Sequence, residues 1–87
     1  MKKSPVAEKF KVTKGGIEYE FEVVEEGGYV VSVPLYPSCA SQGDTFEEAL
    51  SNIQDALIGC LSAARALKLP IPQQLEPLLR QTENLSL

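Results

Sequence analysis

The sequence predicts an α+β domain in which an antiparallel β-meander of three to four strands packs on one long helix. Two patterns carry this prediction. Residues 17–23 alternate strictly between apolar and acidic side chains, which is typical of a strand with one buried face. Residues 46–67 instead repeat apolar side chains at helical spacing. Because 87 residues suffice for one such domain but not for two, we expect a single domain over residues 1–87.

The strands are expected in chain order. Residues 9–12 alternate in the same way, and a Gly-Gly pair then turns the chain into the strand just described. A second Gly-Gly pair supplies the positive φ of a tight turn. Residues 29–33 form the return strand, which ends at Pro34 because proline cannot donate to a ladder. Residues 39–42 are the candidate for a short fourth strand.

The long helix follows from a single apolar stripe, and Pro70 and Pro72 cannot continue it, so we expect it to end near Lys68. Ile58 lies off the stripe, and Gly59 beside it weakens the helix, so this pair is the candidate oligomer contact. The members of the stripe are Phe46, Ala49, Leu50, Ile53, Ala56, Leu57, Cys60, Leu61, Ala64 and Leu67.

The two ends of the chain are expected to be less regular. Residues 1–8 should form a flexible arm. Residues 73–87 form a tail with three leucines at helical spacing around Pro77, and proline is tolerated in a first helical turn. We therefore expect a short helical or extended tail.

Acidic residues are concentrated in the middle of the chain. Residues 15–64 contain nine of them and no Lys or Arg, although the net charge of the whole chain is only −4. Such a segment repels phosphate backbones and attracts basic proteins. It is also the pattern of a solvated surface that only keeps a protein in solution, and charge alone leaves both interpretations open. The nine are Glu18, Glu20, Glu22, Glu25, Glu26, Asp44, Glu47, Glu48 and Asp55.

What the chain lacks excludes several classes of protein. It contains no histidine, the usual general base and a common metal ligand, and its two cysteines, Cys39 and Cys60, cannot close a zinc site. We therefore expect no enzyme activity, no cofactor and no metal. No apolar run reaches the roughly 18 residues of a membrane helix, and no secretory signal is present. These absences favour a cytoplasmic protein without membrane contact and without a disulfide.

The stretch GDTFEE indicates a joint between a strand and a helix. Thr45 and Glu48 form a capping box, in which the Thr45 hydroxyl accepts from the Glu48 amide and the Glu48 side chain reaches back to the Thr45 amide. Asp44, Glu47 and Glu48 oppose the positive end of the helix dipole, and Gly43 allows an unusual backbone. A catalytic role for these carboxylates has less support, because no basic residue lies nearby in sequence to hold a substrate phosphate.

Residues 25–72 resemble the HicB family of antitoxins. The shared pattern is a strand ending in proline, a proline corner with a cysteine, a small strand, a G-D-T-x-E-E-A helix start and a later Ile-Pro. Leu35 and Ser38 depart from it, since the family usually has Asp and Gly there. The matching residues are Gly28, Tyr29, Val33, Pro34, Pro37, Cys39, Gln42, Gly43, Asp44, Thr45, Glu47, Glu48, Ala49, Ala56, Ile71 and Pro72.

The resemblance implies a partial RNase H-like fold, β-β-β-α, without catalytic carboxylates. It also implies a partner: a small basic HicA-like ribonuclease toxin that degrades mRNA and whose active site the antitoxin covers. Many members add a C-terminal DNA-binding domain, for which the 15 residues after Pro72 are too few. We therefore expect a minimal form without direct DNA binding.

Members of the family commonly assemble as dimers or tetramers, so a homo-oligomer is expected. The alternative is a stand-alone HicB-like oligomeric scaffold or regulatory protein without a toxin. The candidate partner-binding residues are Glu18, Glu20, Glu22, Glu25, Glu26, Tyr36, Glu47 and Glu48. The structural motif consists of Pro34, Pro37, Gly43, Asp44, Thr45 and Glu48.

Overall fold

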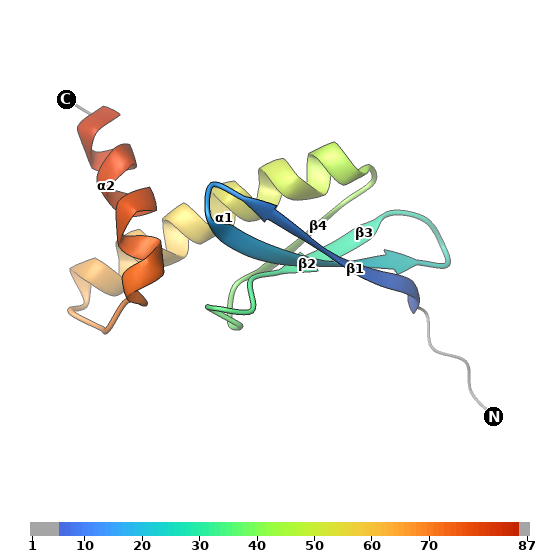
Figure 1. Cartoon of the computed structure of the whole chain (residues 1–87), viewed down its shortest axis with the longest axis horizontal. Coiled ribbons are helices and arrows are strands. Elements are labelled where there is room, and N and C mark those ends of the chain that lie inside the picture. Colours follow the sequence, from blue (N-terminus) through green and yellow to red (C-terminus); the bar gives the residue numbers. More distant parts are fainter. Residues whose placement is uncertain (1–5, 86–87) are drawn as a thin grey trace.

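A four-stranded antiparallel sheet, one long helix and a short C-terminal helix make up residues 6–85, which are the residues that the computed structural model describes (Figure 1). The predicted α+β meander is confirmed, including its fourth strand. The elements are β1 (Val6–Lys14), β2 (Ile17–Val24), β3 (Tyr29–Ser32), β4 (Ala40–Gly43), α1 (Phe46–Ala66), the 3₁₀ turn η1 (Gln73–Leu75) and α2 (Glu76–Leu85).

Strand β1 begins earlier than the sequence predicts. It starts at Val6, so residues 6–8 belong to a strand and not to a flexible arm. The reason lies in β2, which is long enough to offer Val24 as a ladder partner for Val6, across a register shift next to Glu8. The rest of the predicted arm, residues 1–5, lies outside the described residues, as do the last two residues of the tail.

The sheet has the strand order β1-β2-β3-β4, so each strand pairs with its neighbour in sequence. Lys14 pairs with Ile17, which leaves Gly15 and Gly16 as a two-residue turn. Their φ angles of 60° and 79° are those that only glycine adopts readily in such a hairpin. The second Gly-Gly pair, after β2, also has positive φ at both residues, as predicted.

Helix α1 lies across one face of the sheet, and the core fills the space between them (Figure 1). Four aromatic rings form its centre. Phe21 is fully buried and stacks on Phe10 at a centroid distance of 5.3 Å, with Phe46 of α1 at 4.7 Å and Tyr29 at 6.4 Å. The buried apolar residues of this core are Ile17, Tyr19, Phe21, Val31, Val33, Cys39, Ala49, Ile53, Leu57, Leu61, Leu75 and Leu79.

Helix α1 ends at Ala66, two residues before the predicted end. Lys68 adopts φ 60°, a left-handed conformation in which glycine is usual. The Leu69 amide donates to the Ala64 carbonyl at 2.8 Å, and the Lys68 amide donates to the Arg65 carbonyl at 3.0 Å. These two hydrogen bonds are those of a Schellman motif, so the chain turns away before Pro70 is reached.

The tail forms η1 and α2, which confirms the predicted short helix, and it packs back onto the core. Leu75 and Leu79 are 0% and 1% exposed and join the same cluster as the sheet and α1. Arg65 of α1 donates to the Glu76 carboxylate of α2 at 3.1 Å. The segment after Pro72 is thus part of the domain. None of the helices in residues 6–85 is long and apolar enough to cross a membrane.

Candidate partner-binding surface

The sheet face turned away from α1 carries the β2 glutamates Glu18, Glu20 and Glu22. Strand β1 brings lysines to the same face, because the register sets Lys9 opposite Glu22 and Lys11 opposite Glu20. The Lys9 Nζ lies 3.8 Å from Glu22 Oε2, and the Lys11 Nζ lies 3.6 Å from Glu18 Oε2. The β2 glutamates therefore share this sheet face with lysines and do not form a purely acidic surface. The two lysines precede the acidic segment in sequence but lie beside it across the ladder.

The other predicted acids gather at one end of the sheet. Glu25 and Glu26 lie in the turn between β2 and β3, and Glu47 and Glu48 lie in the first turn of α1. The first residue of β3 pairs with the last residue of β4, which brings the turn and the helix start to the same end (Figure 1). Asp44, predicted only as part of the structural motif, joins them. These five exposed residues are called the acidic end below.

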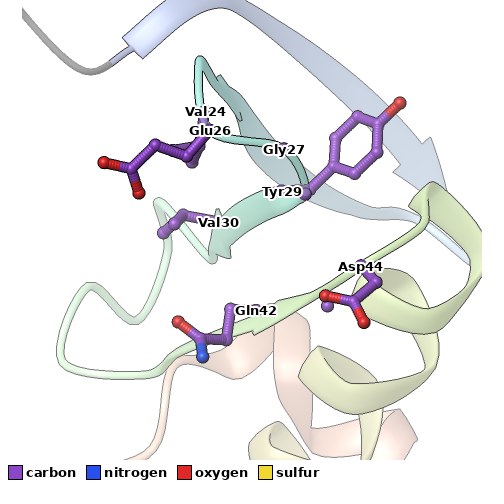
Figure 2. A pocket seen from close by; sticks show the side chains of 9 residues that line it. Val24, Glu26, Gly27, Tyr29, Val30, Gln42 and Asp44 are labelled. Atoms are coloured by element: carbon purple, nitrogen blue, oxygen red, sulfur yellow. The ribbon is translucent and has the colours of Figure 1, made fainter.

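A pocket of about 260 Å³ lies within the acidic end. Figure 2 shows Glu26 and Asp44 on different segments that border it, the first in the turn after β2 and the second directly after β4. The two elements approach closely, since a Cβ added to Gly28 would lie 2.9 Å from the Gly43 carbonyl oxygen. The lining residues are Val24, Glu26, Gly27, Gly28, Tyr29, Val30, Gln42, Gly43 and Asp44. Carboxylates at such a border suit an ammonium or guanidinium group.

The start of α1 is capped by its own side chains. The Glu48 amide donates to Thr45 Oγ1 at 3.0 Å, as the capping box predicts. The reciprocal bond differs from the prediction: the amide that donates to Glu48 Oε1, at 2.8 Å, is that of Asp44 and not that of Thr45. Amides at a helix start lack partners in the helix. The long Glu48 side chain reaches the amide of Asp44, the residue before the N-cap Thr45. Glu48 is thus held in place within the acidic end.

Comparison with known proteins identifies the family of this chain. Residues 19–86 match the family model described as HicB-like antitoxin of bacterial toxin-antitoxin systems. The chain belongs to the HicB-like antitoxin family. The match confirms the resemblance seen in the sequence and extends beyond residues 25–72 on both sides. It therefore includes most of β2 and the packed C-terminal tail.

Several curated proteins match part of this chain. Antitoxin HicB 1 of Photorhabdus laumondii is 44% identical over 61 aligned positions, covering 58% of this chain and 39% of that protein. A UPF0150 protein of Synechocystis is 41% identical, covering 56% of this chain and 62% of that protein. A UPF0150 protein of Thermoplasma acidophilum is also 41% identical, covering 56% and 71%. The first two matches thus span less than two thirds of those relatives. No solved structure gives a significant match.

Within this HicB-like domain, Gly43 serves close packing and not an unusual backbone. Its φ is not positive, unlike that of the turn glycines. A Cβ at this position would lie 2.5 Å from the Ala49 amide nitrogen and 2.9 Å from both Ala49 Cα and the Glu48 carbonyl carbon. These are backbone atoms of α1 that cannot rotate away. The conformational role that the sequence predicts for Gly43 is therefore wrong, and the reason for glycine is contact between β4 and the helix.

We expect Gly43→Ala to lower the free energy of unfolding by about 1–3 kcal/mol, because the added methyl forces β4 away from α1. At roughly 4–8 °C per kcal/mol, the melting temperature should fall by about 10 °C in a thermal scan. Gly59→Ala is the matched control, since its methyl would meet nothing within 4 Å. In a helix interior it should stabilise by roughly 0.5–1 kcal/mol. Equal melting temperatures for the two variants would contradict the close-packing role.

The proline corner between β3 and β4 consists of two successive β-turns. The Tyr36 amide donates to the Val33 carbonyl, and the Cys39 amide donates to the Tyr36 carbonyl, each at 2.9 Å. Pro34 and Pro37 occupy the second position of these turns, where their fixed φ is favourable. Tyr36 is half-buried against the core, at the far end of β3 from the acidic end. The structure therefore does not bring Tyr36 together with Glu25, Glu26, Glu47 and Glu48.

The candidate oligomer contact stays a prediction. Ile58 is half-buried and is not among the residues of the core, and Gly59 is exposed with open space around it. Among the described residues, nothing approaches Gly59 closely enough to explain a glycine at this helix position. This part of α1 would be accessible for contact with a second copy of the chain.

The Cys39 thiol and the Tyr19 phenol of the core are harder to ionise than usual, because the pKa of each is raised. Burial raises the pKa of the Cys39 thiol to about 12, and a hydrogen bond with Cys60 adds to the effect. Burial also raises the pKa of Tyr19, against the opposite effect of its hydrogen bond with Gln54. Cys39 is thus the buried apolar residue predicted from the sequence. Within residues 6–85, no three Cys, Asp or Glu side chains gather as a metal site would require.

Proposed function

We propose that this chain is an antitoxin that binds a small basic HicA-like ribonuclease toxin and covers its active site. Membership of the HicB-like antitoxin family supports this proposal, and so does the acidic end, which is the observation that carries it. All five carboxylates are exposed, and within residues 6–85 none of them has an ion-pair partner. A surface of this kind attracts a basic protein and speeds the encounter.

The proposed mechanism is competition for the toxin's basic groups. A ribonuclease needs cationic side chains to hold the phosphates of its substrate. Carboxylates of the acidic end would pair with the same side chains, and the pocket between Glu26 and Asp44 has room for one Lys or Arg side chain. At the helix start the Glu48 carboxylate is held in place by the Asp44 amide, so this side chain loses little freedom on binding.

Charge reversal in the turn tests the surface. We expect Glu25→Lys/Glu26→Lys to weaken binding to a HicA-type toxin, sought first among the neighbouring genes, by roughly 10- to 100-fold at low salt, chiefly through slower association. Surface plasmon resonance at several salt concentrations would measure both rates. Asp55→Lys is the control, because Asp55 is exposed on α1 outside the acidic end, and it should change the affinity less than about threefold.

The possible outcomes test the docking surface and the antitoxin function separately. Equal loss in the double variant and the control would contradict the acidic end as the docking site. No binding of the unmodified protein to that toxin, at micromolar concentration and low salt, would contradict the antitoxin function itself. In cells, the antitoxin function predicts that co-expression of this chain relieves growth arrest caused by the toxin.

A second candidate function is a stand-alone HicB-like oligomeric scaffold without a toxin. Two exposed leucines after α1 favour self-association: Leu67 is 69% exposed and Leu69 is 53% exposed. Light scattering would detect an oligomer, and Leu67→Ser/Leu69→Ser should dissociate it if these residues form the contact. An oligomer with no toxin gene beside it would favour the scaffold over the antitoxin.

A further inference from the structure

Strand β1 forms one outer edge of the sheet and is open along the side away from β2. It is nine residues long, and within residues 6–85 its only strand partner is β2. The opposite edge differs, because β4 has only four residues and Asn52 Nδ2 of α1 donates to its Gln42 carbonyl at 2.8 Å. The outer backbone groups of an edge strand can pair with another chain. Strand β1 is therefore the longer and more open of the two edges.

Burial of the core-facing side chains falls off toward this edge. Phe21 and Tyr19 of β2 are 0% and 1% exposed, whereas their ladder partners on β1, Phe10 and Val12, are only half-buried. Phe10 still belongs to the aromatic centre through its stacking on Phe21. Part of the apolar row of β1 thus stays exposed at the edge. An added strand with apolar side chains on this face would cover it and remove further apolar surface from water.

The other face of the same edge is basic. The side chains of Lys9 and Lys11 are 58% and 60% exposed, and each approaches one β2 glutamate, at 3.8 Å and 3.6 Å. Exposed ion pairs of this kind are weak, so both ammonium groups can still pair with a carboxylate on the open side. Residues 8–14 contain three lysines and one glutamate. The edge therefore carries a positive charge, in contrast to the acidic end.

This charge selects against a second copy of the chain. Two β1 strands paired antiparallel about Phe10 would set Lys9 of one copy opposite Lys11 of the other. Like charges directly opposite each other destabilise a ladder, and lysines on edge strands commonly prevent self-pairing. The strand that fits is acidic where β1 is basic and apolar where β1 is apolar. Strand β2 itself has this pattern, since Glu22 pairs with Lys9 and Phe21 pairs with Phe10.

We propose that β1 is a docking edge for an extended segment of a partner protein in which apolar and acidic residues alternate as they do in β2. Such a segment extends the sheet by one strand, and its main-chain hydrogen bonds to β1 supply affinity. Its apolar side chains cover Phe10 and Val12, and its carboxylates bind Lys9 and Lys11 on the opposite face. This partner is distinct from the basic toxin, and its binding does not use the acidic end.

The probe is a blocked peptide with the sequence of residues 17–23, IEYEFEV, added to the purified full chain labelled with ¹⁵N. We expect a dissociation constant of about 1 mM or below, with shifted signals and slowed hydrogen exchange at amides of β1. Two matched peptides serve as controls. One has lysine in place of each glutamate, and the other has the same composition with its glutamates placed together, so that the alternation is lost. Each should bind at least about tenfold more weakly.

Lys9→Thr/Lys11→Thr tests the protein side of the contact. Threonine favours strands and the two exposed ion pairs contribute little stability, so the melting temperature should change little. The variant should bind the acidic peptide roughly 2- to 30-fold more weakly, because two cross-strand charge pairs are lost. Arg80→Gln removes a positive charge from an exposed position on α2 and is the control, with binding unchanged. If the double variant failed to fold, the two control peptides would still decide.

Three results would overturn the proposal. The first is the absence of any change at the β1 amides with peptide at about 1 mM. The second is equal binding of the rearranged peptide, which would show that charge alone attracts it. The third is self-pairing of the unmodified chain through β1, seen as protection of the β1 amides that grows with protein concentration. None of these measurements involves the toxin, so the antitoxin function is tested separately.

Discussion

Phe21→Ala is expected to remove about 3–5 kcal/mol from the free energy of unfolding. The ring is fully buried and touches aromatic rings from β1, β3 and α1, so its loss opens a cavity where all layers of the domain meet. A domain of this size has a total stability of roughly 4–13 kcal/mol. Urea unfolding followed by circular dichroism should show a much lower midpoint, and the variant should be partly unfolded at 37 °C.

Two controls make the Phe21 result specific. Phe21→Leu keeps most of the buried volume and should cost less than half as much as Phe21→Ala. Val30→Ala removes an apolar side chain from the open face of the sheet, where Val30 is only half-buried, and should cost less than about 1 kcal/mol. A Phe21→Ala loss no larger than that of Val30→Ala would contradict the aromatic centre of the core.

Leu75→Ala is expected to cost about 2–5 kcal/mol, because Leu75 is 0% exposed although it lies in the C-terminal tail. The side chain belongs to the same cluster as Ile17 of β2 and Leu61 of α1. Its truncation should therefore loosen the whole domain and not only α2. The melting temperature should fall by roughly 10 °C or more in differential scanning calorimetry.

Leu67→Ala is the matched control, with the same substitution eight residues earlier on a side chain that is 69% exposed. It should change the free energy of unfolding by less than about 0.5 kcal/mol in the monomer. If both leucine variants behaved alike, the tail would not pack on the core in solution. Hydrogen exchange should in that case find the amides of α2 unprotected.

The periodicity of apolar residues in the sequence predicted β2 and α1 correctly. The alternation in β2 and the stripe of α1 arise because each element must bury one face. Each pattern can therefore be recognised from a short segment of the sequence alone. The same holds for the Thr45 cap and for the hairpin glycines, whose roles depend only on neighbours in the chain. The family motif was equally local, and the match to the HicB-like antitoxin model confirms it.

The candidate site could be predicted only in part. Its acids were found from composition, but their grouping depends on which strand ends meet. Register joins the Glu25–Glu26 turn to the helix start and adds Asp44, while it sets Lys9 and Lys11 among the β2 glutamates. No local pattern in the sequence carries this information, since a strand's partner residues lie elsewhere in the chain.

The sequence by itself determined the class of fold, the order of strands and helix, the Thr45 hydroxyl cap, the glycine turns, and membership of the antitoxin family. The tertiary structure alone decided that five of the acids meet at one end of the sheet while the β2 glutamates lie among lysines, that Gly43 makes room for a helix backbone, and that the tail completes the core. The physical reason is the same in each case. Local conformational preferences act between neighbours, whereas close contacts between distant residues depend on strand register and on how the helix crosses the sheet.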